Sequence, residues 1–437
     1  MSILIHTVSI RTAETSFNWI EDGYVIINEG VFKKIADGKP SEKELTEADE
    51  VINGQGKWVC PGLVNTHGHA GMSLLRGYSD DLPLDQWLKE KMWPFEAKLD
   101  LEATKAARGL AMVEMIRSGT TTFLEMYHLF MHEFAQDITD AGMRATLMRS
   151  MIGLCSKEEQ KEKLLEAVEF AKTWHKGADS RIQTMLAPHA PYTCPPEFIE
   201  MIVEEAIKLD LPIHMHLAET RKEVREHIQQ YHHHPLEHLE KLGFLNEARW
   251  LFAHGVHLNE EHIDLLAEYK AGISHNPISN LKLGSGVAPI AEMLQKGVEI
   301  GIGTDSVASN NTLDMIEEMR MAAFIHKGIA EDPILIPAEV AIKMATKNGA
   351  ELLEHEKTGE IKTGYKADFM IIDSHAAHMQ PASNRDSHIV YAAKSSDVTD
   401  VYVDGLPLMR NKELLTLDEE KIKFEANEHY QRVRSYI

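Results

Sequence analysis

The sequence has little cysteine and no long hydrophobic run, and each of these absences excludes a class of protein. Its three cysteines, Cys60, Cys155 and Cys194, are far apart and odd in number, which argues against a disulfide scaffold and fits a reducing cytosol. No uncharged apolar run approaches the roughly 20 residues that span a bilayer, and the N-terminus lacks the pattern of a signal peptide. We therefore expect a cytoplasmic protein without a membrane partner.

Positive charge is also scarce. The chain has 45 Lys and Arg against 68 Asp and Glu, which gives a formal net charge of −23. A nucleic-acid-binding protein normally presents a basic face, so we expect no nucleic-acid partner. The length of 437 residues, 43% of them hydrophobic, is sufficient for one large domain and a smaller one.

Short apolar runs alternate with amphipathic, helix-like stretches through the middle of the chain. Such alternation predicts right-handed βαβ units around a parallel sheet, and about eight units in about 250 residues is the size of a (β/α)8 TIM-like barrel. An open doubly wound sheet is disfavoured because no glycine-rich phosphate turn follows an early strand. The expected strands are Trp58–Thr66, Thr120–Met126, Arg144–Met151, Ile182–Pro188, Pro212–Leu217, Trp250–His254, Gly272–Ser274 and Val298–Thr304.

Both ends of the chain have a different pattern, in which apolar runs are separated by turn pairs such as Asp22-Gly23 and Asp404-Gly405. These are hairpin signals. We therefore expect an α/β protein whose residues 58–366 form the barrel. Residues 1–57 and 367–437 are expected to form a small composite β-sandwich.

Histidine is abundant, with 24 residues, and some of it is patterned. A chain of this composition contains about 1.3 His-x-His pairs by chance, so one pair is weak evidence. Three occur, at His67/His69, His214/His216 and His232/His234. The last pair lies on a polar segment and is interpreted as solvated surface, and His214 as a histidine packed inside the barrel.

The other two pairs gain weight because more ionisable residues end further strands. His67 and His69 end the first expected strand, and the strand period of two puts both side chains on one face. His216 ends the fifth strand, His254 the sixth and Asp305 the eighth. The carboxyl ends of barrel strands meet above one point, where imidazole and carboxylate ligands suit Zn²⁺ or a similar divalent ion.

These motifs together resemble the amidohydrolase superfamily along nearly the whole chain. The resemblance rests on the segments 61–69, 216–219, 253–255, 303–305 and 362–368. Some members hold two metals bridged by a carboxylated lysine at the end of strand four, but here Leu186–Tyr192 contains no lysine. The resemblance therefore implies one divalent ion, most naturally Zn²⁺, with the ligands His67, His69, His216 and Asp305.

A zinc ion lowers the pKa of water enough to supply hydroxide near neutral pH. Glu219 is three residues after His216 and could deliver a proton to a ring nitrogen and then to a leaving amine; alternatively, it caps the helix expected near Thr220. The resemblance implies that His254 positions the hydroxide or stabilises developing charge. Asp305 could serve both as ligand and as base.

The segment after the first expected strand resembles the 5-methylthioadenosine/S-adenosylhomocysteine deaminases. That resemblance implies that Glu96 holds the ribose hydroxyls, His189 contacts the purine and Arg149 reaches the group beyond the ribose. It adds Ser309 as a further substrate contact, whereas Trp93 and Trp87 either cover the substrate or pack the loop. The second arginine of that family has no clear match in Ile152–Lys157.

The sequence thus predicts a zinc-dependent deaminase of adenine nucleosides, with a small-molecule partner and, from the resemblance, a homo-oligomeric state. Methylthioadenosine, adenosylhomocysteine and adenosine remain open as preferred substrates. The alternatives are a related hydrolase acting on guanine, cytosine or a chlorinated triazine, and a non-catalytic binding scaffold. Glu96 and Arg149 favour a ribose-bearing ligand, and the complete set of ligand and acid residues disfavours the scaffold.

Overall fold

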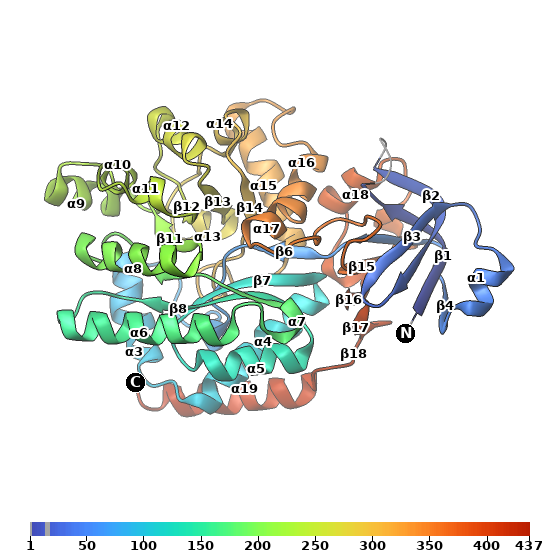
Figure 1. The fold of residues 1–437 in the computed structure, drawn as a ribbon, viewed down its shortest axis with the longest axis horizontal. Coiled ribbons are helices and arrows are strands. Elements are labelled where there is room, and N and C mark those ends of the chain that lie inside the picture. The colour runs from blue at the N-terminus through green and yellow to red at the C-terminus, as the bar shows by residue number, and fades with distance from the viewer. Residues whose placement is uncertain (1, 14–17) are drawn as a thin grey trace.

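The computed structural model describes residues 2–13 and 18–437, whose strands form two sheets (Figure 1). The first is a mixed sheet built from both ends of the chain, with β4 paired to β1 beside the strand order β18-β17-β16-β15-β5-β1-β2-β3. Its strands are β1 (Ser2–Arg11), β2 (Trp19–Asn28), β3 (Val31–Asp37), β4 (Glu50–Asn53), β5 (Lys57–Pro61), β15 (Phe369–Asp373), β16 (Val398–Val403), β17 (Leu406–Arg410) and β18 (Glu413–Leu414).

The second sheet is parallel and curled, in the order β10-β8-β7-β6-β14-β13-β12-β11, with β9 paired to β8. An isolated parallel bridge also joins Leu186, between β9 and β10, to Ile213 in β11. The expected alternation of parallel strands with helices is therefore confirmed. The strands are β6 (Leu63–Asn65), β7 (Thr120–Tyr127), β8 (Arg144–Met151), β9 (Ile182–Thr184), β10 (Ala187–Pro188), β11 (Ile213–Leu217), β12 (Trp250–His254), β13 (Gly272–His275) and β14 (Ile300–Ile302).

The first expected barrel strand, Trp58–Thr66, is two strands that belong to different sheets. β5 pairs antiparallel with β15 in the mixed sheet, whereas β6 pairs in parallel with β7 and β14. Gly62 separates them, and a Cβ there would lie 2.2 Å from Thr121, so only glycine fits this crossing. Because both strands are buried, the apolar run continues across the break and conceals it. The predicted boundary at residue 58 therefore falls inside β5.

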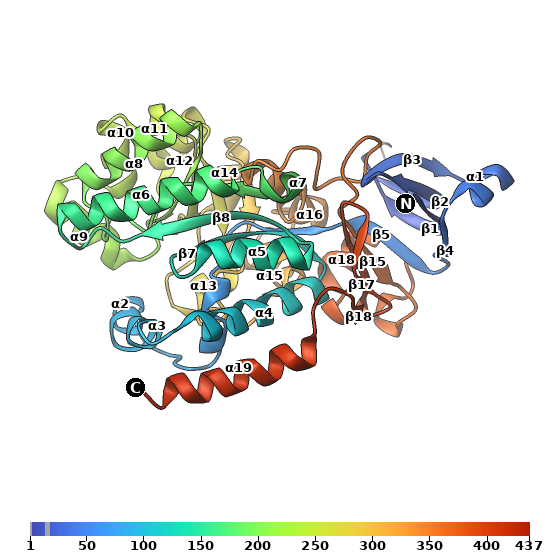
Figure 2. The ribbon, with the colours of Figure 1, turned by 60° about the horizontal axis from the view of Figure 1, so that its bottom comes forward.

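The helices cover the outside of the parallel sheet, and α19 (Glu419–Arg434) lies beside α4 (Leu101–Arg117) although it belongs to the C-terminal segment (Figures 1 and 2). This segment, residues 367–437, was expected to complete the sandwich, but Ala426 and Val433 of α19 are buried and Tyr430 stacks on Phe95. No described helix is long and apolar enough to cross a membrane.

The amphipathic pattern of the sequence predicts one helix over Thr220–Leu242. The structure has two helices there, because His232 has left-handed backbone (φ 63°) and Pro235 begins a second helix. The prediction that His232 and His234 are solvated surface residues is wrong for His234, which is buried and accepts a hydrogen bond from the Leu236 backbone N–H.

The longer helices are α4 (Leu101–Arg117), α5 (Met131–Ala141), α6 (Lys157–Trp174), α8 (Pro196–Leu209), α9 (Arg221–Tyr231), α12 (Glu260–Glu268), α15 (Met315–Ala330) and α19 (Glu419–Arg434). The shorter ones are α1 (Glu42–Glu47), η1 (Ala70–Leu75), α2 (Leu84–Trp87), η2 (Leu88–Met92), α3 (Trp93–Glu96), α7 (Gly177–Ser180), α10 (Pro235–Lys241), α11 (Phe244–Glu247), α13 (Pro277–Lys282), α14 (Ile290–Gln295), α16 (Ala338–Met344), α17 (Lys347–Leu352), η3 (Ala377–Met379), α18 (Arg385–Tyr391) and η4 (Ser395–Asp397).

Candidate active site

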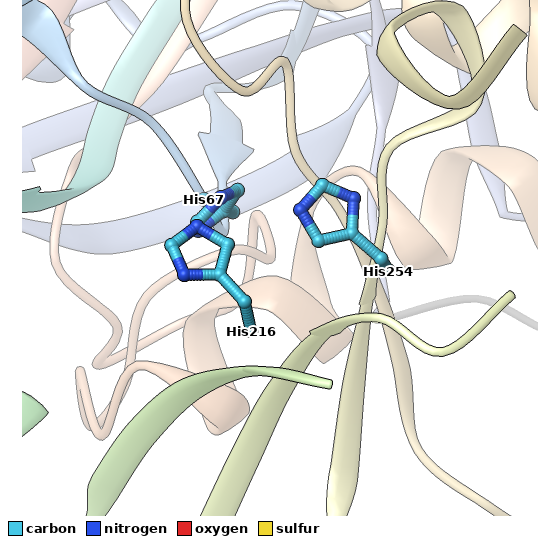
Figure 3. Close-up of side chains that lie close together, drawn as sticks. All are labelled: His67, His216 and His254. Atoms are coloured by element: carbon cyan, nitrogen blue, oxygen red, sulfur yellow. The ribbon is translucent and has the colours of Figure 1, made fainter. Parts of the chain in front are cut away.

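The four predicted ligands meet at the carboxyl edge of the parallel sheet. His69 Nε2 lies 3.4 Å from His216 Nε2 and 3.3 Å from Asp305 Oδ1, and His67 Nε2 lies 3.6 Å from the same oxygen. Two overlapping groups of side chains could hold a metal ion here, His67 with His69 and Asp305, and His67 with His216 and His254. Figure 3 shows the second group, in which His216 of β11, His254 of β12 and His67, which follows β6, lie close together.

The outward-facing nitrogen of each imidazole is held by a neighbour. Nδ1 of His69 lies 2.6 Å from the Met126 carbonyl oxygen, and Nδ1 of His216 lies 2.7 Å from that of His189. Donation to a carbonyl fixes the proton on Nδ1, so the lone pair of Nε2 points into the cluster. Nε2 of His67 is buried and has no hydrogen-bond partner. A buried acceptor of this kind needs a partner, and a divalent ion fits this donor set.

Two further histidines of the cluster are oriented in the same way. Nδ1 of His67 lies 2.8 Å from Nε2 of His214, and Nδ1 of His254 lies 2.8 Å from the side-chain oxygen of Asn280. His214, interpreted from the sequence as a packing residue, thus holds His67 in place. Asn280 is a partner that the sequence reasoning did not identify.

Electrostatics in the cluster favour a cation. Burial and the neighbouring imidazoles lower the pKa of His67 and His216 well below the ordinary range, so both are neutral, as ligands must be. Against the effect of burial, hydrogen bonding and charge from Asp305 raise the pKa of His69 to about 9. His69 in turn lowers the pKa of Asp305 although burial opposes it. The Asp305 carboxylate therefore favours a positive charge beside His69 Nε2, which a divalent ion bound there would supply in place of a proton.

Asp305 is fixed by three donors beyond the histidines. The Ser306 backbone N–H donates to Oδ1 at 2.7 Å, and the hydroxyls of Ser279 and Ser309 donate to Oδ2 at 2.6 and 3.0 Å. Ser309, predicted as a substrate contact, is thus placed with its hydroxyl against this carboxylate. The backbone of Asp305 is left-handed (φ 60°), and these bonds hold the side chain over the cluster.

Glu219 follows β11 and is buried, with Oε2 3.8 Å from His254 Nε2. Burial raises the pKa of its carboxyl, so the group retains a proton at higher pH than an exposed glutamate and suits an acid role. The alternative assignment of Glu219 as a helix cap is wrong. Thr220 caps α9, and its hydroxyl accepts a hydrogen bond from the Glu223 N–H at 3.2 Å.

A cavity of about 550 Å³ opens beside this cluster. Glu96 lies in its wall, buried in α3, and accepts a hydrogen bond of 2.6 Å from the Tyr127 hydroxyl; burial raises the pKa of its carboxyl. The cavity brings together all the residues predicted to contact substrate, namely Trp93, Glu96, Arg149, His189, Glu219 and Ser309.

Arg149, Trp93 and Trp87 all line the cavity, but they differ in their burial and in their other contacts. Arg149 lines the cavity but also forms an ion pair with Glu166 and donates to the Ser150 carbonyl at 3.1 Å. Trp93 is half-buried in the cavity wall, whereas Trp87 is buried and donates to the Ser79 carbonyl at 2.9 Å.

Tyr127 and Lys163 are among the wall residues that the sequence reasoning did not identify. Tyr127 ends β7, and the rule that barrel sites form at strand ends could have found it. Lys163 lies in α6 and donates to the Ile152 carbonyl at 2.9 Å, beside the loop where no second arginine was found. Nothing in a helix interior distinguishes such a lysine from a solvated one.

Comparison with known proteins agrees with this geometry. The model of the amidohydrolase family matches residues 58–408, and the chain belongs to that family. A relative from Halalkalibacterium halodurans is 58% identical over 99% of both chains. One from Shouchella clausii is 55% identical over 99% of this chain and 100% of its own. Both are named 5-methylthioadenosine/S-adenosylhomocysteine deaminase, and within the amidohydrolases the chain belongs with them.

Solved structures give the same picture of the fold. An adenosine deaminase from Xanthomonas campestris with bound zinc has a TM-score of 0.91 and 34% identity, covering 99% of this chain and 98% of its own. An atrazine chlorohydrolase from Arthrobacter aurescens complexed with zinc has a TM-score of 0.89, covering 98% of this chain and 100% of its own. At 21% identity the latter supports the fold alone.

Proposed function

We propose that this protein is a zinc-dependent deaminase that hydrolyses the amino group of adenine nucleosides to give the inosine analogue and ammonia. Its substrates are 5′-methylthioadenosine, S-adenosylhomocysteine and adenosine. One observation carries the proposal: the histidine–aspartate cluster and the protonatable Glu219 lie at one end of a cavity whose wall holds Glu96 and Arg149. The names of relatives 58% and 55% identical to the chain support the same substrates.

The metal is a single zinc ion held by His67, His69, His216 and Asp305. The unpartnered Nε2 of His67 supports this assignment, as does the absence of a lysine in the segment 186–192 that could bridge a second metal. A zinc ion bound there would act as a Lewis acid that makes a water molecule nucleophilic near neutral pH. The scaffold is a closed (β/α)8 barrel with a β-sandwich at its side, and the Leu186–Ile213 bridge supports the closure.

Three side chains move or stabilise charge during the reaction. Glu219 donates its proton to a ring nitrogen, takes up the proton of the hydroxyl that the attack adds to the ring, and delivers that proton to the leaving amine; its burial beside His254 supports this role. Asp305 accepts the proton that the attacking water loses and returns it to Glu219 at the end of the cycle. His254, with its Nε2 facing Glu219, orients the nucleophile and stabilises the negative charge that develops on it.

Substrate recognition uses further residues of the cavity wall. Glu96 accepts hydrogen bonds from the ribose hydroxyls; Tyr127 already donates to Oε1, which leaves Oε2 as the freer acceptor. His189 contacts the purine, and Trp93 covers it. Arg149 faces the substituent beyond the ribose, and exchanging its exposed partner Glu166 for a substrate carboxylate would retain its ion pair.

Ammonia release by zinc-loaded protein tests the proposal, with methylthioadenosine, adenosylhomocysteine, adenosine, adenine, guanine and cytosine offered in parallel. Turnover of the nucleosides with little on free bases is expected, and their rank order reports what Arg149 recognises. Turnover of a base alone would overturn the substrate assignment and retain the metal site. If zinc-loaded protein released no ammonia from any of the six compounds, the proposed deamination would be wrong and a non-catalytic binding scaffold would be favoured.

A further inference from the structure

The segment that joins β11 to α9, residues 218–220, carries Glu219 and is held by a second, buried glutamate. Oε1 of Glu223 accepts a hydrogen bond from the Ala218 backbone N–H at 2.9 Å, and Oε2 accepts one from the Glu219 N–H at 2.8 Å. Glu223 is 5% exposed. Its carboxylate therefore uses one oxygen on each of two consecutive peptide groups, one of which belongs to Glu219 itself.

This arrangement is more than a helix cap. In a capping box, the glutamate at the third helical position accepts from the backbone N–H of the capping residue, here Thr220. That contact is the longest of the three, at 3.5 Å, while the two short bonds go to the preceding residues. A glutamine could satisfy one N–H with its oxygen, but its NH₂ group would face the other N–H; only a carboxylate accepts from both.

The other side of the same peptide segment is also tied. The Ala218 carbonyl accepts a hydrogen bond of 3.0 Å from the His257 N–H, and the Leu217 carbonyl accepts one of 3.0 Å from the Gly255 N–H. Both donors lie just after His254 at the end of β12. Ala218 itself has left-handed backbone (φ 49°), a conformation that an alanine keeps only when its surroundings impose it.

We propose that Glu223 is a positioning residue for the deamination reaction. By holding the N–H groups of Ala218 and Glu219, it maintains the turn that aims the Glu219 carboxyl at the reacting atoms beside His254. This inference rests on the proposed function, because it assigns Glu223 a part in the step that Glu219 performs.

The burial of Glu223 next to Glu219 supports a functional reason for its presence. Burial, followed by the nearby charge of Glu219, raises the pKa of Glu223 to about 7. A second buried carboxyl so close to the acid is unfavourable for the fold unless its hydrogen bonds offset the cost. Those bonds go to the segment that carries the acid.

Kinetics of Glu223→Gln, with Thr220→Ala as the matched control, separate positioning from helix capping. Glu223→Gln is expected to lower kcat for adenosine by about 10- to 100-fold, because misplacing a reacting group by about 1 Å has an effect of this size. KM should stay within about two-fold, and the zinc content should stay at the wild-type value, since neither substrate-wall nor ligand side chains change.

Thr220→Ala removes only the hydroxyl that accepts from the Glu223 N–H and leaves both carboxylate bonds to the segment. It should lower the thermal midpoint yet keep kcat within about two-fold of wild type. Equal kcat losses in Glu223→Gln and Thr220→Ala would show that Glu223 acts only as part of the helix cap and would overturn the inference. If Glu223→Gln does not fold, Glu223→Asp retains the charge with shorter reach and should show an intermediate loss of kcat with unchanged KM.

A double-mutant cycle with Glu219→Gln gives the decisive readout. If Glu223 acts through Glu219, adding Glu223→Gln to Glu219→Gln should change the residual rate by less than about two-fold. The inference would be overturned if the rate losses of Glu219→Gln and Glu223→Gln multiplied in the double variant, or if Glu223→Gln alone kept the full kcat. Either outcome would leave the proposed function intact as long as the wild-type protein deaminates nucleosides. A wild-type protein that deaminates no nucleoside would instead remove the proposed function and this inference with it.

Discussion

At the scale of single residues, each imidazole of the cluster is oriented by its outward-facing nitrogen. Met126, His189, Asn280 and His214 each hold one of the Nδ1 atoms, so the four Nε2 atoms face inward. Such outer partners fix the tautomer and the ring angle before any ion binds. Loss of a ligand and loss of the acid should therefore have separable consequences.

Glu219→Gln is expected to retain zinc and lose about 10²- to 10⁴-fold in kcat, because it removes a proton donor and leaves the histidine cluster intact. His67→Ala, in contrast, should lose both zinc and turnover. Metal content by atomic absorption and ammonia release on the same samples check both expectations. Normal turnover of Glu219→Gln would show that the acid has been assigned to the wrong residue.

Tyr127→Phe tests the part of the cavity wall that holds Glu96. The hydroxyl donates to buried Glu96 at 2.6 Å, and without it the pKa of that carboxyl should rise further, which weakens its acceptance of ribose hydroxyls. We expect KM for methylthioadenosine to rise about 3- to 10-fold with little change in kcat. Steady-state kinetics at saturating zinc measure this, and an unchanged KM would exclude Glu96 as the ribose contact.

At the scale of secondary-structure elements, strand ends place the site and helix caps hold it. His216 and His254 end adjacent parallel strands whose register sets His216 opposite Ala253. A second pair of titratable residues lies at the amino-terminal end of β14 in the same sheet. Glu299 precedes β14 and hydrogen-bonds to Glu351 of α17. Burial and this bond raise the pKa of Glu299 to about 7.

Stability should consequently fall as the pH rises from about 4.5 to about 7. The folded pKa of Glu299 lies above its unfolded value, so the stabilisation is complete at low pH and is lost as this carboxyl ionises. Glu351→Gln keeps a hydrogen-bonding partner without a second charge. The decrease in thermal midpoint between about pH 5 and pH 7 should therefore be smaller in the variant than in wild type. Parallel pH curves for the two proteins would contradict the coupling.

At the scale of the whole molecule, a buried ion pair joins the two sheets. Arg144 in β8 has a fully buried side chain, and its Nε and Nη2 lie 2.6 and 3.1 Å from the carboxylate of Asp368, beside β15. Nη2 also lies 2.6 Å from Asp404, which is 23% exposed. Asp368 belongs to the 362–368 motif, so the sequence motif corresponds to the connection between the sheets rather than to the active site.

Asp368→Asn should destabilise the protein by about 3–5 kcal/mol, since it leaves a buried guanidinium without its main counter-charge. Asp404→Asn is the matched control and should cost less, because the lost charge is partly exposed and Asp368 remains. Urea unfolding followed by circular dichroism compares the two. A loss below about 1 kcal/mol for Asp368→Asn would show that the pair contributes little to stability.

Most of the fold followed from local sequence patterns, and the failures have local causes. The βαβ alternation predicted the parallel sheet because period and length are properties of short segments. The break inside Trp58–Thr66 was concealed, since both strands are buried and the run remains apolar across Gly62. The position of α19 beside α4 was equally concealed, because an amphipathic pattern does not specify the surface that a helix packs against.

The sequence by itself determined which residue types end which strands, and with them the gathering of His67, His69, His216 and Asp305. Strand period and parallel alignment carry that information locally. Only the tertiary structure decided that His214 holds His67, that Tyr127 donates to Glu96, and that Glu223 binds the N–H groups beside Glu219. The first two contacts join segments 147 and 31 residues apart, and in all three the bonding atoms are brought together by packing, which no local pattern encodes.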